Sequence, residues 1–285
     1  MKEPIASLFN ATIKVLGGAP DGALGRHAFI EEYDDYFALS VEVGRRSVRV
    51  THYYDASTKL IVLYGELLDG SGSGLSLDNV LRLSFGHGPF RFALGDAGEL
   101  CLRADYDPSW NDAVAPSFAA DVVNSIGELL NAAELRAAPG ADRPKALHVA
   151  DAVENDCTIS RETVDVRREL ESCFGDALRA DRDFWSVQLT TSERSYLCIA
   201  RIVNARLALY IDSASEMQST APVLQAALRH NYHIRFVKLC LVGATQRAVA
   251  TELPFSMISK NLLDYFARRL PLYADQIRGH LPDFL

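Results

Sequence analysis

Two stretches of this chain repeat the same order of residue types 147 positions apart. Residues 81–105 read LRLSFGHGPFRFALGDAGELCLRAD, and residues 228–252 read LRHNYHIRFVKLCLVGATQRAVATE. Both begin with Leu-Arg, continue into strand-forming residues and reach a turn at the same distance. In the first stretch Gly-Asp-Ala-Gly (95–98) supplies the residues that a tight turn between two strands needs. We therefore expect a hairpin in each half of the chain and a fold that is built twice.

The repeat extends to the strand-like runs that precede these hairpins. The matched runs are 36–43 with 184–190, 47–54 with 195–202, and 60–67 with 206–212. Leu60 and Val62 fall on Leu207 and Leu209 at the same spacing of 147, and the first pair of runs fits better at 148. Apolar residues at helical spacing come before, between and after these strands. Each half is therefore expected to read helix, three strands, helix, two strands, helix.

This order predicts an α+β fold made of two tandem α-β-β-β-α-β-β-α units. Each unit would form an antiparallel five-stranded sheet with helices packed on it, and the two units would form an internal pseudo-dimer. The segment AAPGADRPKA (137–146) is rich in Ala, Pro, Gly and charge, which is typical of a linker. We expect the first unit at 1–138, the linker at 139–150 and the second unit at 151–285.

Charge and composition exclude several classes of function. The chain has 285 residues and a formal net charge of −8, whereas nucleic-acid binding requires clustered Lys and Arg. No apolar run reaches the roughly 20 residues of a membrane helix, and the N-terminus does not resemble a signal peptide. The five cysteines form no CxxC pair, which is typical of reduced thiols in the cytosol. We expect a cytoplasmic protein with neither a nucleic-acid nor a membrane partner.

No catalytic, cofactor-binding or metal-binding residue is predicted. The chain contains no GxSxG, HExxH, Walker or GxGxxG motif. His230 and His233 with Cys240 could suggest zinc, but no second ligand pair lies close in sequence. His87 lies in a loop before a strand, where a catalytic histidine can occur, although its counterpart at the repeat spacing is Ile234. The acidic run 31–35 could hold a cation, and a solvated loop is the favoured interpretation.

The candidate binding residues lie on the first strand of each predicted sheet. They are Phe37, Leu39, Val41, Trp185, Val187 and Leu189. Period-two alternation puts each set of three on one face of its strand. One interpretation is that they belong to the core. The other is that each strand lies near a sheet edge and accepts an extended peptide by strand addition.

The order of elements resembles the class I chaperones of type III secretion and the YbjN-like family of bacterial proteins. The resemblance is carried by LRLSFGHGPFRFALGDAGELCLRADY followed by a helix that starts near a proline, and by LRHNYHIRFVKLCLVGATQRAVATELP likewise. It covers nearly the whole chain, twice. Class I chaperones are small homodimers. Two fused copies thus imply either a monomer with an internal pseudo-dimer or a homodimer.

The resemblance implies a non-catalytic, chaperone-like protein that holds an extended client segment or a partner protein. One alternative is a regulator or adaptor that binds a folded partner. Another is an enzyme without a recognisable motif, because a fold does not fix a function.

Overall fold

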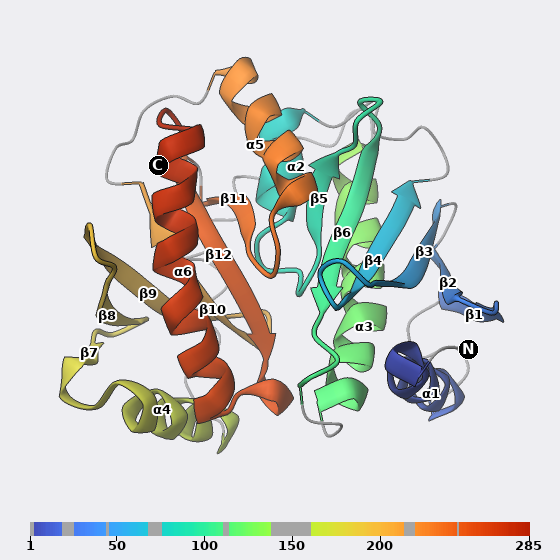
Figure 1. Ribbon diagram of the computed structural model, residues 1–285, viewed down its shortest axis with the longest axis horizontal. Helices are drawn as coiled ribbons and strands as arrows, with labels where there is room; N and C mark the ends of the chain where they lie inside the picture. Colours follow the sequence, from blue (N-terminus) through green and yellow to red (C-terminus); the bar gives the residue numbers. More distant parts are fainter. Residues whose placement is uncertain are drawn as a thin grey trace.

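The computed structural model describes residues 3–18, 26–43, 46–67, 76–110, 114–137, 161–213, 220–243 and 245–285. Within these ranges the chain is a mixed α+β protein with two six-stranded antiparallel sheets and six α-helices (Figure 1). The predicted linker, residues 139–150, lies outside the described residues.

The first sheet has the strand order β1-β2-β3-β4-β6-β5. Its strands are β1 (Arg26–Glu32), β2 (Tyr36–Val43), β3 (Arg46–Asp55), β4 (Leu60–Leu67), β5 (Arg91–Leu94) and β6 (Leu100–Tyr106). Its helices are α1 (Glu3–Gly18), α2 (Leu77–Leu83) and α3 (Val114–Ala137).

The second sheet has the order β7-β8-β9-β10-β12-β11, so the two sheets have the same topology. Its strands are β7 (Arg179–Ala180), β8 (Trp185–Thr190), β9 (Ser195–Val203), β10 (Arg206–Asp212), β11 (Lys238–Val242) and β12 (Gln246–Pro254). Its helices are α4 (Arg161–Phe174), α5 (Ala221–His233) and α6 (Lys260–His280), and the last of these continues through Pro271.

Each sheet has six strands rather than the five expected, because β1 and β7 add an outer strand. Glu31 and Glu32 therefore belong to a strand and not to a solvated loop. The hairpin begins at Tyr33, whose N–H donates to the carbonyl of Tyr36 at 3.0 Å. The Glu31 carboxylate is balanced by Arg49 at 2.7 Å, which makes an acidic residue compatible with this sheet position.

The predicted spacing of β4 and β10 is one residue out. Val62 pairs with Asp105 in the first sheet, and Ala208 pairs with Glu252 in the second. Asp105 and Glu252 are 147 positions apart, but their partners Val62 and Ala208 are 146 positions apart. Strands β4 and β10 are therefore related by 146 positions rather than 147. The turn between β3 and β4 spans residues 56–59, whereas the turn between β9 and β10 spans only residues 204–205. The second turn is two residues shorter, which changes the spacing from 148 in the strand before it (Tyr53 with Arg201) to 146 in the strand after it.

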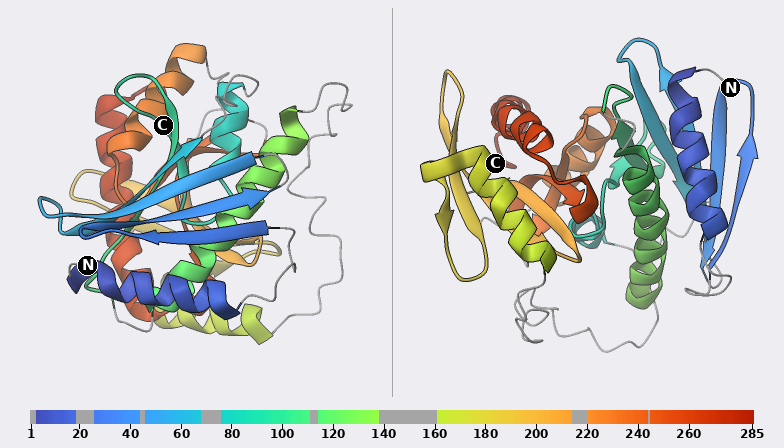
Figure 2. Two further views of the ribbon diagram at one scale, coloured as in Figure 1. Left: turned by 90° about the vertical axis from the view of Figure 1, so that its right-hand side faces the viewer. Right: turned by 90° about the horizontal axis from the view of Figure 1, so that it is seen from below.

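Helices pack on one face of each sheet and cover part of the other face. Helices α1 and α3 contact each other and the strands of the first sheet, and α4 and α6 take the same places on the second (Figure 2). The alternating residues Val48, Val50, Leu207 and Leu209 point into these layers and are buried. The larger of two core clusters includes residues from both halves, and a smaller cluster around Tyr210 lies on the second sheet.

The two halves meet through their middle helices, which cross to the opposite sheet. Helix α5 packs on β5 of the first sheet, and α2 packs on β11 of the second. Phe85, directly after α2, packs edge-on against Tyr210 of the second sheet, with ring centroids 5.6 Å apart. Each half therefore supplies the cover for the outer sheet face of the other half.

Candidate functional site

A buried ion pair in the first half is completed by groups from the second half. Arg91 and Asp105 lie 3.0 Å apart, and their side chains are only 1% and 0% exposed. The Arg91 Nε donates to the carbonyl of Asn231 at 2.7 Å. The N–H of Phe236 donates to the Asp105 carboxylate at 2.9 Å. Because a buried charge is costly without its partners, these contacts fix how the halves dock.

The reciprocal arrangement occurs in the second half. Lys238 and Glu252 form a buried ion pair of 2.8 Å. Lys238 also donates to the carbonyl of Gly88 at 2.7 Å. The N–H groups of Gly86 and Gly88 donate to the Glu252 carboxylate at 2.8 and 2.9 Å. Lys238 and Glu252 lie 147 positions after Arg91 and Asp105. The two ion pairs therefore lie at matching positions of the two sheets, and each contacts groups of the other half.

A third buried cation strengthens the contact between the halves. Arg206 at the start of β10 lies 2.7 Å from Asp121 and 2.9 Å from Glu128, both on α3. Burial raises the pKa of Asp121 to about 6, against the opposing effect of Arg206. Perturbed carboxyls occur in active sites as well as in structural networks, so the space around Asp121 decides between the two.

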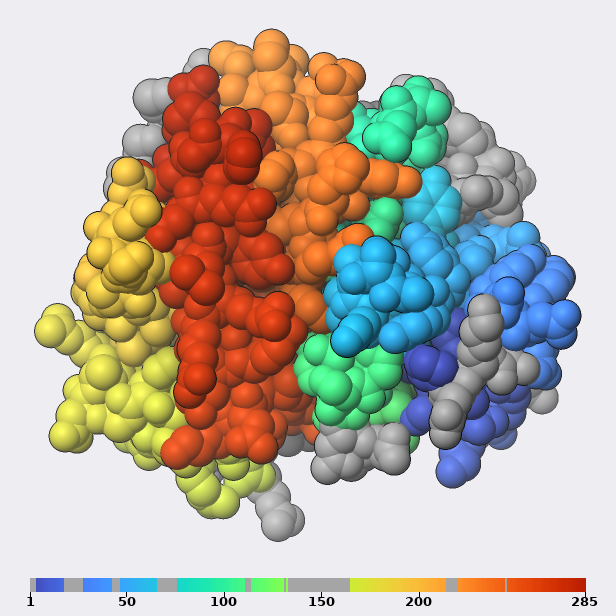
Figure 3. Space-filling view, in the orientation of Figure 1, coloured from blue at the N-terminus to red at the C-terminus, as the bar shows by residue number. Residues whose placement is uncertain are grey.

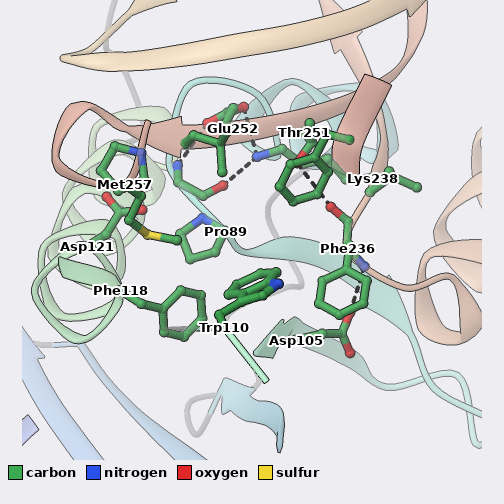
Figure 4. Close-up of a pocket in the computed structure, with 15 residues that line it drawn as sticks. Pro89, Asp105, Trp110, Phe118, Asp121, Phe236, Lys238, Thr251, Glu252 and Met257 are labelled. Carbon is green, nitrogen blue, oxygen red and sulfur yellow. Dashed lines mark hydrogen bonds and ion pairs between the residues drawn. The ribbon is translucent and has the colours of Figure 1, made fainter. Parts of the chain in front are cut away.

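The cavity beside these pairs is too small for a metabolite. Trp110 and Phe118 lie along one side of it, and Lys238 and Glu252 lie along the opposite side (Figure 4). Its volume is about 30 Å³, which accommodates a water molecule, whereas ligand sites occupy roughly 300–1,000 Å³. The size of the cavity and its polar groups therefore fit a contact between the two halves with room for a water molecule.

The predicted binding residues of β2 lie in the core. Phe37, Leu39 and Val41 are each 0% exposed, and Phe37 contacts the ring of Phe9 on α1. Strand β2 has β1 on its outer side, so it is not an edge strand. These side chains therefore contact the protein's own helices rather than an outer surface.

The predicted binding residues of β8 have a different environment. Val187 and Leu189 are buried, and Trp185 is half-buried and packs against the core. Their strand, however, is covered on its outer side only at Trp185 and Ser186, because β7 has two residues. The structure thus brings β8 close to a sheet edge while burying the side chains that suggested it.

Beyond Ser186, the side of β8 that faces away from β9 has no strand partner among the described residues. The backbone N–H of Asp181 donates to the carbonyl of Phe184 at 2.9 Å, between β7 and β8. The backbone N–H of Thr191 donates to the carbonyl of Arg194 at 2.8 Å, between β8 and β9. Backbone groups alternate in direction along an antiparallel strand. The N–H and C=O groups of Gln188 and Thr190 therefore point away from β9. No other described strand pairs with them there.

His230 and His233 line the same open hollow on α5, but Cys240 and His87 do not line it. Cys240 is buried in the outer-face cluster of the second sheet, and His233 is exposed on α5. His87 lies 3.7 Å from Glu128. Among the described residues, no group of three or more His, Cys, Asp or Glu could hold a metal ion. Burial raises the pKa of the Cys101 and Cys198 thiols to about 12, so these thiols stay protonated at neutral pH.

Sequence reasoning missed the buried charges, and it proposed an edge at both first strands, whereas only β8 lies beside an incomplete outer strand. Arg91 and Lys238 stand in strands where a charged residue normally indicates a solvent-facing position. The available signal was that both cations, and both acids 14 residues later, keep their charge at the repeat spacing. The open edge follows from the length of β7, which no local pattern in residues 179–180 reveals.

The comparisons with known proteins give no family for the chain. No protein-family model, no curated protein and no solved structure matches it. None of the described helices combines the length and the apolar content that crossing a membrane requires.

Proposed function

We propose that the chain consists of two copies of one α+β unit, joined as an internal pseudo-dimer. The identical strand order of the two sheets supports this proposal. So do the reciprocal ion pairs Arg91–Asp105 and Lys238–Glu252, because matched contacts that cross in both directions are what a two-fold interface produces. Apart from the additional outer strand, β1 or β7, the unit resembles the chaperones of type III secretion and the YbjN-like proteins in its order of elements.

The function that this geometry favours is non-catalytic binding of an extended protein segment in the cytosol. The client would add as a strand to the outer edge of β8, in the manner of a chaperone. The observation that carries the proposal is the difference in length between the outer strands. Strand β1 covers β2 with seven residues, whereas β7 covers β8 with two and leaves Gln188 and Thr190 without a described strand partner.

The side chains around this edge suit a client that alternates between apolar and polar residues. On one face Gln188 pairs with Leu197, which is 51% exposed. Phe174 and Leu178, which come shortly before β7, are partly buried and pack against the core. A bound strand would gain affinity from main-chain hydrogen bonds and selectivity from these side chains.

A proline scan of the edge tests the proposal. The full chain is used to select extended peptides of about 12 residues from a displayed library, and the affinity is then measured for Gln188→Pro and Gln188→Ala. Proline removes only an outward N–H, a position where edge strands tolerate it. Gln188→Pro should weaken peptide binding about tenfold by losing a hydrogen bond and the fit of the incoming strand. Gln188→Ala should bind normally because its backbone is intact.

Three outcomes would contradict the proposal. One is the absence of any selected peptide, and another is equal affinity of the two variants when both are folded by circular dichroism. The third is turnover of a small molecule at the Asp121 cavity, which would favour the enzyme reading. Capture of folded proteins only, through a surface away from β8, would favour an adaptor.

A further inference from the structure

The outer strand of the first sheet, β1, has a self-complementary sequence. It reads RHAFIEE from Arg26 to Glu32, with two basic-type residues at one end, two acids at the other and apolar residues between them. If two such strands lie antiparallel with Phe29 at the centre, Arg26 of each copy falls opposite Glu32 of the other. His27 then falls opposite Glu31. Opposite charges across strands stabilise pairing, and like charges destabilise it.

The backbone of β1 fits the same register. Because the N–H of Tyr33 donates to β2, alternation directs the backbone groups of Phe29 toward β2 and those of Ala28, Ile30 and Glu32 outward. In the Phe29-centred register, Ala28 of one copy lies opposite Ile30 of the other, so both members of this pair present outward groups. The Phe29 pair at the centre is then a non-hydrogen-bonded pair, in which side chains approach most closely.

The side chain at this centre is an exposed aromatic ring. Phe29 is 49% exposed on the outer face of the sheet, and Ala28 is exposed. No described strand pairs with β1 on its outer side. An apolar edge strand in this state is a template for another strand. Proteins usually protect such edges with inward-pointing charges or a bulge, whereas here the charges are arranged to attract a copy of the same strand.

We propose that two copies of the chain associate through β1, antiparallel about Phe29, and join their first sheets into one continuous sheet. The occupant of this edge is a second copy because an identical strand, laid antiparallel, places acidic residues opposite basic ones and apolar residues opposite apolar ones. Strands β1 and β8 lie at opposite sides of the molecule (Figure 3). The dimer therefore leaves the β8 edge free, and its existence does not depend on the client-binding proposal.

A charge exchange tests the register. Sedimentation of the full chain should show a monomer–dimer equilibrium, and Glu32→Arg should raise the dissociation constant about tenfold because two opposite-charge pairs become two like-charge pairs. Arg26→Glu should do the same, and the double exchange Arg26→Glu with Glu32→Arg should restore dimerisation. These residues stand six positions apart on one strand, about 20 Å, so rescue within one chain is excluded.

A second set of variants distinguishes loss of the dimer from a loss of stability of β1 itself. Phe29→Lys places two ammonium groups together at the centre and should abolish the dimer. Tyr53→Lys makes the same kind of change on an aromatic residue that is 37% exposed in β3, away from the centre, and should leave the dimer intact. All variants are checked for folding by circular dichroism. A chain that stays monomeric at millimolar concentration, or a dimer that none of these substitutions weakens, would overturn the proposal.

Discussion

Lys238 and Glu252 form an ion pair of 2.8 Å inside the second half, yet the groups that complete it belong to the first half. The N–H groups of Gly86 and Gly88 bind the Glu252 carboxylate, and the carbonyl of Gly88 binds the Lys238 ammonium. This ion pair therefore forms part of the junction between the halves, and removing it tests that junction directly.

Lys238→Met should destabilise the protein by about 3–5 kcal/mol, because Glu252 would remain buried without its cation. Arg49→Met is the matched control. Arg49 pairs with Glu31 at the same kind of distance, but both side chains are about 40% exposed, and the expected cost is below about 1 kcal/mol. Urea unfolding of both variants measures the difference. Equal costs would show that the buried pair does not hold the halves together.

Gly88→Ala should destabilise the protein more than Gly98→Ala. Both glycines have a positive φ, +79° and +85°, so each alanine adopts a strained backbone at a cost of roughly 1–2 kcal/mol. A Cβ at Gly88 would also lie 2.0 Å from Ser125 Oγ, whereas a Cβ at Gly98 meets nothing within 4 Å. The excess cost at Gly88 reports the close packing of this loop on α3. Thermal unfolding of the two variants tests it, and equal melting temperatures would contradict it.

Stability should fall on acidification because His52 is buried as a neutral ring. Burial lowers the pKa of His52 to about 3 from its ordinary value of 6.5, and its Nδ1 lies 3.1 Å from the carbonyl of Val50. Between these pH values the unfolded chain binds a proton that the folded chain does not. The resulting stabilisation is complete above pH 6.5 and is lost as the pH falls toward 3, by on the order of 4 kcal/mol.

His52→Leu should flatten this pH dependence. Other groups titrate in the same range, so the measured quantity is the difference between the two proteins in free energy of unfolding, followed from pH 7 to pH 4. As the pH falls, the free energy of unfolding should decrease more for the unmodified protein than for the variant. A constant gap would mean that His52 takes up a proton equally well in the folded chain.

The strands that carry clear alternation were predictable from the sequence, with the bounds of β2, β4 and β10 as expected. Strand β1 was not, because the acids Glu31 and Glu32 favour a loop until Arg49, 18 residues after Glu31, is brought beside Glu31. The crossing of α2 and α5 to the opposite sheets depends on contacts between distant residues. A local periodicity does not encode such contacts.

The candidate site was predictable only in part, for a reason visible at Phe37 and Val187. Alternation identifies an apolar face, but a face that is buried by the protein's own helices has the same pattern as one that awaits a partner. What distinguishes β8 from β2 is the outer strand beside each, because β1 has seven residues and β7 has two. The edge at Gln188 therefore became visible only in three dimensions.

Amide hydrogen exchange at Gln188 and Thr190 tests the central claim most directly. In the free chain these amides should exchange faster than those of Val187 and Leu189, which face β9. Adding the tightest peptide from the displayed library should slow the exchange of Gln188 and Thr190 about tenfold or more, while Ala28 on β1 is unaffected. Unchanged exchange at Gln188 and Thr190 with the peptide bound, or protection confined to another surface, would contradict the claim that β8 is the binding edge.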